Sequence, residues 1–106
     1  MKIIDLSQIK SSRRLTMAVD YAVASCRYSG ESLVKFVARS RFASENIQRT
    51  LRAWKAKNRV NFIIPGEKYA LDNMETQYLL NLHPEEAGDE DIGARNALVT
   101  VTFIYS

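Results

Sequence analysis

The chain has 106 residues, of which 46% are hydrophobic and 25% charged, a composition typical of one globular domain rather than of a disordered or low-complexity protein. One cysteine and one histidine exclude an intrachain disulfide and a His/Cys zinc site, and no apolar run reaches the roughly 20 residues that a membrane span needs. We therefore expect a single domain over residues 1–106 in the reducing cytoplasm, without a membrane partner, a metal or a cofactor.

The net charge of +3 hides an uneven distribution along the chain. Residues 1–71 contain 14 basic and five acidic residues, a net charge of +9, whereas residues 72–106 contain one basic and seven acidic residues, a net charge of −6. This asymmetry is typical of a body that binds a polyanion and carries an acidic appendage. The alternative is a solvated surface on which the charges segregate without a function.

The first part of the chain predicts a strand followed by two helices. Residues 2–6 are short and β-branched, as in an edge strand. Apolar residues at helical spacing, a serine N-cap and a terminal glycine indicate a helix from Ser11 or Ser12 to Gly30. Its apolar face comprises Leu15, Val19, Ala22, Val23 and Cys26. A shorter helix is expected over Ser32–Arg39, with Leu33, Phe36 and Val37 on one face.

A longer and more basic helix is expected from Ser44 to about Asn58. Ser44 is a suitable N-cap, and Glu45 places a negative charge in the first turn, where it interacts favourably with the helix dipole. Asn58 is expected to end the helix because asparagine tolerates the left-handed conformation. The apolar face comprises Ile47, Leu51 and Trp54.

Beyond this helix the apolar period changes to two, which predicts a β-hairpin over residues 60–71 with its turn at Pro65–Lys68. A short helix is expected over Met74–Leu82, followed by a mobile acidic loop over residues 83–96. Residues 97–106 predict a C-terminal strand, whose partner is the strand at the N-terminus, the hairpin or a second copy of the chain.

The order of these elements between Gly30 and Leu71 resembles a winged helix-turn-helix domain. The matching segments are residues 33–38 as the first helix of the motif, Phe42 as its apolar plug, residues 44–55 as the recognition helix and residues 62–71 as the wing. The resemblance implies an α+β fold with three to four helices and a small antiparallel sheet, made of the wing hairpin and the C-terminal strand. It implies a winged-helix body over residues 1–82 and duplex DNA as the partner.

The helix at 44–58 is the candidate recognition helix, because an α-helix fits the major groove of B-DNA. Arginine can pair with guanine and asparagine or glutamine with adenine, whereas flanking cations neutralise phosphates. The candidate nucleic-acid-binding residues are Arg39, Arg41, Ser44, Asn46, Gln48, Arg49, Arg52, Lys55, Lys57 and Lys68. The candidates for base contacts are Asn46, Gln48, Arg49 and Arg52. The alternative is a solvated charged face, or a face that contacts protein.

Other chemistries have weaker support in the sequence. His83 stands alone, and Cys26 lies on an apolar helix face, so neither is expected to be catalytic. The acidic residues between positions 85 and 91 do not follow the spacing of a calcium loop. We therefore expect a protein without enzymatic activity.

The leading hypothesis is a small regulator of transcription or replication that binds duplex DNA sequence-specifically. The alternative is a winged-helix protein-interaction module, such as a phage or mobile-element inhibitor of a host protein, in which the acidic loop 85–91 can contact a protein partner. A second stripe on the first long helix, formed by Met17, Tyr21 and Tyr28, is either a homodimer face or packs against the terminal strand.

Overall fold

Two parallel strands joined by a long helix form the first half of the computed structural model, which describes residues 1–106. β1 (Lys2–Asp5) pairs with β2 (Leu33–Val37), and α1 (Ser12–Ser29) connects them. The Ser11 side chain caps α1 by accepting a hydrogen bond from the backbone N–H of Arg14 at 3.3 Å. Gly30 ends the helix with a φ of 78°. The expected edge strand and the limits of the first helix are therefore confirmed.

The second half adds two antiparallel strands. α2 (Arg41–Ala56) leads into β3 (Val60–Pro65), and β4 (Val99–Ile104) inserts between β2 and β3, which gives the strand order β1-β2-β4-β3. The connection between β3 and β4 contains η1 (Gly66–Lys68), α3 (Met74–Leu82) and η2 (Pro84–Gly88). The expected helix at 74–82 and the C-terminal strand are confirmed, and that strand pairs within its own chain.

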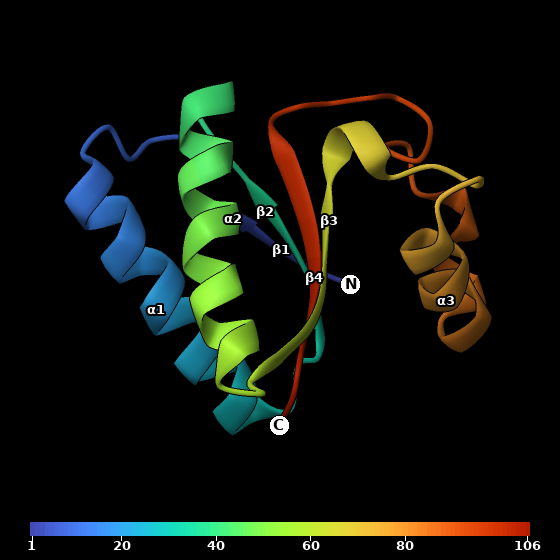
Figure 1. The fold of residues 1–106 in the computed structure, drawn as a ribbon, viewed down its shortest axis with the longest axis horizontal. Coiled ribbons are helices and arrows are strands. Elements are labelled where there is room, and N and C mark those ends of the chain that lie inside the picture. Colours follow the sequence, from blue (N-terminus) through green and yellow to red (C-terminus); the bar gives the residue numbers. More distant parts are fainter.

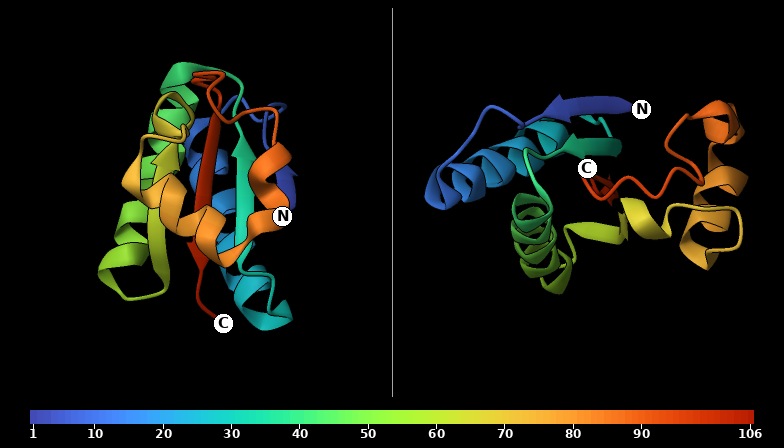
Figure 2. Two further views of the ribbon diagram at one scale, coloured as in Figure 1. Left: turned by 90° about the vertical axis from the view of Figure 1, so that its right-hand side faces the viewer. Right: turned by 90° about the horizontal axis from the view of Figure 1, so that it is seen from above.

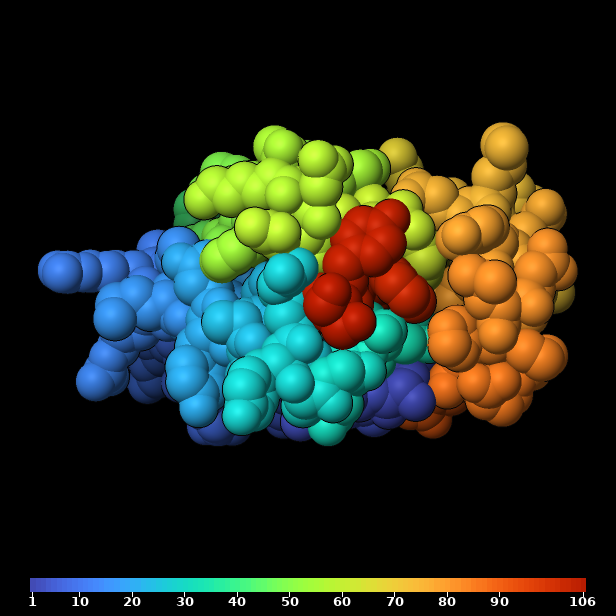
Figure 3. Space-filling view, turned by 90° about the horizontal axis from the view of Figure 1, so that it is seen from below, coloured from blue at the N-terminus to red at the C-terminus, as the bar shows by residue number.

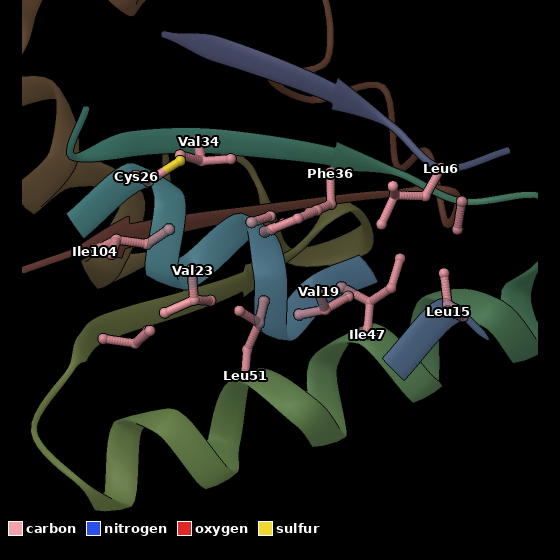
Figure 4. Packing of buried hydrophobic residues seen from close by; sticks show 13 residues of the cluster. Leu6, Leu15, Val19, Val23, Cys26, Val34, Phe36, Ile47, Leu51 and Ile104 are labelled. Carbon is pink, nitrogen blue, oxygen red and sulfur yellow. The ribbon is translucent and has the colours of Figure 1, made fainter. Parts of the chain in front are cut away.

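The sheet separates two layers of helices. α1 and α2 cover one face, whereas α3 and η2 lie on the opposite side (Figures 1 and 2). The larger apolar core lies between the sheet and the first pair of helices (Figure 4). Phe36 of β2 contributes to it together with Ile47 and Leu51 of α2, and all three are at most 1% exposed. Burying each such side chain contributes about 1.5–3 kcal/mol, so α2 is held firmly by its inner face.

A second apolar cluster attaches α3 to the other face of the sheet. Its buried members are Leu33, Phe62, Ile64, Tyr69, Leu79 and Val101. α3 is anchored mainly through Leu79, whereas Met74 is 83% exposed and Leu82 is 52% exposed. One helix therefore covers this face incompletely, and a row of its apolar side chains remains in contact with solvent.

Two hydrogen bonds attach the C-terminal end of the chain to its surroundings, one to the residue stretch that follows α2 and one to α1. The Tyr105 N–H donates to the Arg59 carbonyl at 2.9 Å, and Arg27 Nη1 donates to the Tyr105 carbonyl at 3.0 Å. Figure 3 shows these last residues in red between the end of α2 and the end of α1. The side chains of Met17, Tyr21 and Tyr28 on α1 are 61%, 76% and 96% exposed. The stripe on α1 therefore does not pack against the terminal strand.

Residues 32–39 contain β2 and not the expected short helix. Val34 and Phe36 face α1 and α2, whereas Leu33 belongs to the cluster beneath α3. A strand buried on both faces loses the alternation of apolar and polar residues, so its sequence can equally satisfy a helical spacing. With a strand at this position the helix-turn-helix order is not formed. Phe42, the expected apolar plug, is 69% exposed at the start of α2.

The expected hairpin over residues 60–71 is also not formed. Its first strand is β3, but Gly66–Lys68 continue as a 3₁₀ turn, and Tyr69 is buried in the cluster beneath α3. The partner of β3 is β4, with Val60 opposite Ile104, because a strand distant in sequence occupies the pairing edge. The fold class is α+β as predicted, but the sheet is four-stranded and mixed rather than small and antiparallel.

Candidate nucleic-acid interface

α2 carries most of the candidate residues and begins four residues earlier than expected. The Ser40 side chain, and not that of Ser44, caps the helix by accepting a hydrogen bond from the Ala43 N–H at 3.1 Å. The helix ends before Asn58, which adopts a positive φ of 59°. Asn58 therefore has the left-handed conformation that the sequence predicted, one residue beyond the C-cap.

The outer face of α2 is strongly basic. Arg41, Arg49, Arg52 and Lys55 are all exposed on it, and the acidic residue that accompanies them is Glu45. The flanking Arg39, Lys57 and Arg59 are exposed as well. We call these seven cations the α2 basic face. Only Arg41 among them forms an ion pair, with Glu67 at 3.8 Å, so the other six are free to meet an external anion.

Two of the four residues expected to contact bases point into the protein. Asn46 is 6% exposed, and its Oδ1 accepts a hydrogen bond from Thr16 of α1 at 3.2 Å. Gln48 is half-buried, and its Nε2 donates to Thr100 Oγ1 of β4 at 3.1 Å. This orientation does not favour base contacts by these two residues, because α1 and β4 pack along the two flanks of α2. Arg49 and Arg52 remain on the outer face.

Trp54 lies at the boundary between the core and a polar groove. Its ring packs against the larger core, and its Nε1 donates to Asp20 Oδ1 at 2.8 Å. The Lys57 ammonium lies 5.3 Å from the centre of the ring, a cation–π distance. The groove beside it, between α1 and α2, has a volume of about 440 Å³. Trp54 thus fixes the C-terminal half of α2 and positions one cation of the basic face.

The acidic segment at residues 85–91 is folded against the opposite face of the sheet. Lys35 Nζ lies 2.6 Å from Asp89 Oδ1 and 2.6 Å from Asp91 Oδ2, and the Tyr69 hydroxyl donates to Asp89 Oδ2 at 3.0 Å. The N-terminal ammonium pairs with Glu86 at 3.0 Å. The mobile loop expected at 83–96 is therefore a docked segment, and it lies across the sheet from α2 (Figure 1).

The charges in this buried cluster stabilise one another. Burial alone would raise the pKa of Asp89, but hydrogen bonds from Lys35, the Asp91 backbone and Tyr69 outweigh it and hold the pKa below its ordinary value. Burial would lower the pKa of Lys35, but its bonds to Asp89 and Asp91 raise it. Burial and the adjacent Asp89 carboxylate raise the pKa of Tyr69. Lys35 and Asp89 are therefore charged near neutral pH, and Tyr69 keeps its proton.

The sequence contains one sign of this cluster that helical or strand periodicity does not reveal. Lys35 interrupts an apolar run, and a buried lysine requires a carboxylate partner. The acidic segment at 85–91 was available as that partner, but nothing in the local pattern joins residues 54 positions apart. Cys26 is 3% exposed, as expected for its place on the apolar face of α1, and His83 pairs with the exposed Glu85.

Comparison with known proteins does not assign a family. The chain matches no family model, no curated protein and no solved structure at a significant level. None of its helices is long and apolar enough to cross a lipid bilayer. The functional inference therefore depends on the arrangement of the chain's own charged side chains.

Proposed function

We propose that the protein binds duplex DNA through the α2 basic face and acts, without catalysis, as a regulator of transcription or replication. The observation that carries the proposal is the concentration of seven exposed cations on α2 and its flanks, six of which lack a carboxylate partner. Unpaired cations on one face gain free energy by displacing the counterions that surround DNA phosphates. The acidic residues of the chain end are held on the other side of the sheet and do not neutralise this face.

The shape of α2 supports a groove-binding role. A helix supported from behind by a sheet and a second helix can present its outer face to the major groove, about 12 Å wide in B-DNA. Arg49 is the side chain that we propose for base contacts, with guanine as the base that arginine pairs with best. The remaining cations, together with Lys68, would position the helix by contacting phosphates.

The first test is fluorescence anisotropy of the protein against random-sequence duplex DNA between about 50 and 200 mM salt. We expect micromolar binding that weakens by orders of magnitude across this range, because several phosphates are contacted. Such a result would justify a selection experiment for a preferred site. Absence of binding at the lowest salt concentration would contradict the proposal.

A matched pair of single substitutions tests which surface is used. Arg52→Gln removes one exposed cation from α2, whereas Lys2→Gln removes one from β1, at the far edge of the sheet. We expect Arg52→Gln to weaken duplex binding and to reduce the slope of log K against log salt by about one, because one phosphate contact is lost. Lys2→Gln should change neither quantity. Equal effects of the two substitutions would show that binding is a diffuse response to net charge.

A second candidate function is that of a protein-interaction module. The observation that favours it is the apolar stripe of Met17, Tyr21 and Tyr28, which is exposed along the outer side of α1. Aromatic residues and methionine are enriched in protein interfaces. The same stripe is the candidate contact surface of a homodimer in both proposals. The acidic segment offers less to a partner than the sequence suggested, because Asp89 and Asp91 are engaged by Lys35.

A further inference from the structure

A second groove, with a volume of about 330 Å³, lies between α2 and the chain around η1. Three cations line it from two separate elements: Arg41 and Arg52 from α2, and Lys68 from the end of η1. Two carboxylates, those of Glu45 and Glu67, also line it, so the groove carries a net positive charge. Because the cations come from elements distant in sequence, the tertiary fold assembles this groove.

Ser44 lies in the wall of this groove with an unsatisfied hydroxyl. The residue is 2% exposed, and its Oγ has no hydrogen-bond partner in the protein. It is the one buried side-chain oxygen or nitrogen of the molecule in this situation. A buried hydroxyl without a partner is destabilising, so an external group that supplies the partner would be favoured. Gln48 also lines the groove, but the hydrogen bond that its side chain makes is from Nε2 to Thr100 and not to Ser44.

We propose that this groove binds a phosphate group of the nucleic acid, with Ser44 Oγ as a donor and Arg41, Arg52 and Lys68 as the charged partners. The inference rests on the proposed DNA binding and gives it a defined phosphate subsite beside the basic face. A phosphate has enough oxygens to accept from the serine hydroxyl and from two or three cations at once. Arg41 is held only loosely by Glu67, at 3.8 Å, and can turn toward a bound phosphate.

The test separates a ligand-binding role of Ser44 from a structural one. Inorganic phosphate is titrated into the wild-type protein and Ser44→Ala, with the backbone amide resonances of residues 41–48 and 66–68 as the readout. We expect these resonances to shift in the wild type, and the affinity to fall about tenfold in Ser44→Ala, because a hydrogen bond to a charged group is lost. Ser25→Ala, an exposed serine of α1, is the matched control and should bind as the wild type does.

Thermal unfolding without phosphate provides the second readout. Ser44→Ala should have a melting temperature equal to or above that of the wild type, because the substitution removes an unpaired hydroxyl and no internal bond. A lower melting temperature would show that the hydroxyl has a partner in the protein, and would overturn the proposal. Unchanged phosphate affinity in Ser44→Ala would overturn it as well.

Duplexes with a 5′-phosphate or a 5′-hydroxyl identify the source of the phosphate. A preference for the phosphorylated end that disappears in Ser44→Ala assigns the groove to a terminal phosphate, whereas equal weakening of both duplexes assigns it to the backbone. Full duplex binding by Ser44→Ala, with unchanged phosphate affinity, overturns the subsite and leaves the basic face intact. A phosphate response without any duplex binding overturns the assignment to nucleic acid and the proposed function together.

Discussion

Lys35 is 5% exposed in the middle of β2, and its ammonium group is held between Asp89 and Asp91. Replacing it by methionine keeps most of the side-chain volume but leaves two buried carboxylates without a counter-charge. Removing one partner from a buried ion pair costs about 3–5 kcal/mol. We expect Lys35→Met to lower the free energy of unfolding by this amount, which urea denaturation would measure.

A compensated variant provides the control for this prediction. Lys35→Met combined with Asp89→Asn and Asp91→Asn removes the buried charges together, and a neutral cluster of similar shape carries no uncompensated charge. We expect this triple variant to be more stable than Lys35→Met alone. A triple variant no better than the single one would mean that the lysine acts through its packing and not through its charge.

The depressed pKa of Asp89 predicts a loss of stability in acid. The ordinary value is 3.8, and the folded protein holds this carboxyl below it. The stabilisation is therefore complete above the unfolded-state pKa and is lost as the pH falls through the lower folded-state pKa. The raised pKa of Lys35 affects stability at high pH instead. Its contribution is complete below the ordinary value of 10.5 and is lost as the pH rises through the higher folded-state pKa.

Melting temperatures measured between neutral pH and about pH 2 test this predicted loss of stability in acid. We expect the wild type to lose more stability across this range than Asp89→Asn, which has no proton to bind at this position. Lys35, Tyr69 and Asp91 face position 89 in both proteins, so they form a shared background. Identical acid profiles of the two proteins would contradict a depressed pKa at Asp89.

At the level of single residues, the sequence identified the charge of the site better than its geometry. The exposed cations, from Arg39 to Lys57, were predicted from composition and helical spacing alone. The inward orientation of Asn46 and Gln48 was not, because it depends on α1 and β4 flanking α2 on both sides. Helical spacing predicts one buried face, and it does not show how wide the neighbouring elements make that face.

At the level of elements, three helices and the terminal strand could be predicted because each has a cap or a clear period. The serine cap and the terminal glycine of α1 and the alternation of threonines in β4 are local signals. β2 gave no such signal, because this central strand is buried on both faces and four of its five residues are apolar. β3 was predicted as a strand, but its partner lies about 40 residues further along, beyond any local pattern.

The junction between β3 and η1 depends on a glycine for reasons of space. A Cβ at Gly66 would lie 1.8 Å from the Asn96 carbonyl oxygen and 2.8 Å from a methyl group of Val99. We expect Gly66→Ala to cost about 1–3 kcal/mol or more, because backbone atoms must move to admit the methyl group. Urea denaturation would show this as a lower transition midpoint.

Gly88→Ala is the matched control for this substitution. A Cβ at Gly88 meets nothing within 4 Å, so the change should stay within about 0.5 kcal/mol of the wild type. If both alanine variants were equally stable, the close approach of residues 66 and 96 would be wrong. The expected hairpin turn at Pro65–Lys68 would then need to be reconsidered.

At the level of the whole molecule, the fold turns a charge difference along the sequence into a difference between two faces. The sheet lies between the basic α2 and the acidic segment that follows α3 (Figure 1). Lys35 fastens that segment to β2 by ion pairs with Asp89 and Asp91. The acidic residues therefore cannot cover the basic face while the segment is docked, so masking of the basic face requires release of the segment.

Neutralising exposed charges on each side tests this separation. Glu85→Gln with Glu90→Gln changes the acidic side without touching the partners of Lys35, and Glu45→Gln changes the α2 face. Electrostatic screening acts over about 8 Å at 0.15 M salt but about 30 Å at 0.01 M. The molecule measures 34 × 28 × 21 Å, so a charge on the far side is screened at the higher salt concentration.

We expect the two glutamine substitutions at 85 and 90 to change the affinity for duplex DNA by less than about twofold at 0.15 M salt and to increase it at 0.01 M. Glu45→Gln should increase affinity at both salt concentrations, because this carboxylate lies among the cations of the α2 basic face. Fluorescence anisotropy at the two concentrations measures both effects. A large gain for the 85/90 variant at 0.15 M salt would show that the acidic segment reaches the α2 basic face, and the docked arrangement would then be only one of its states.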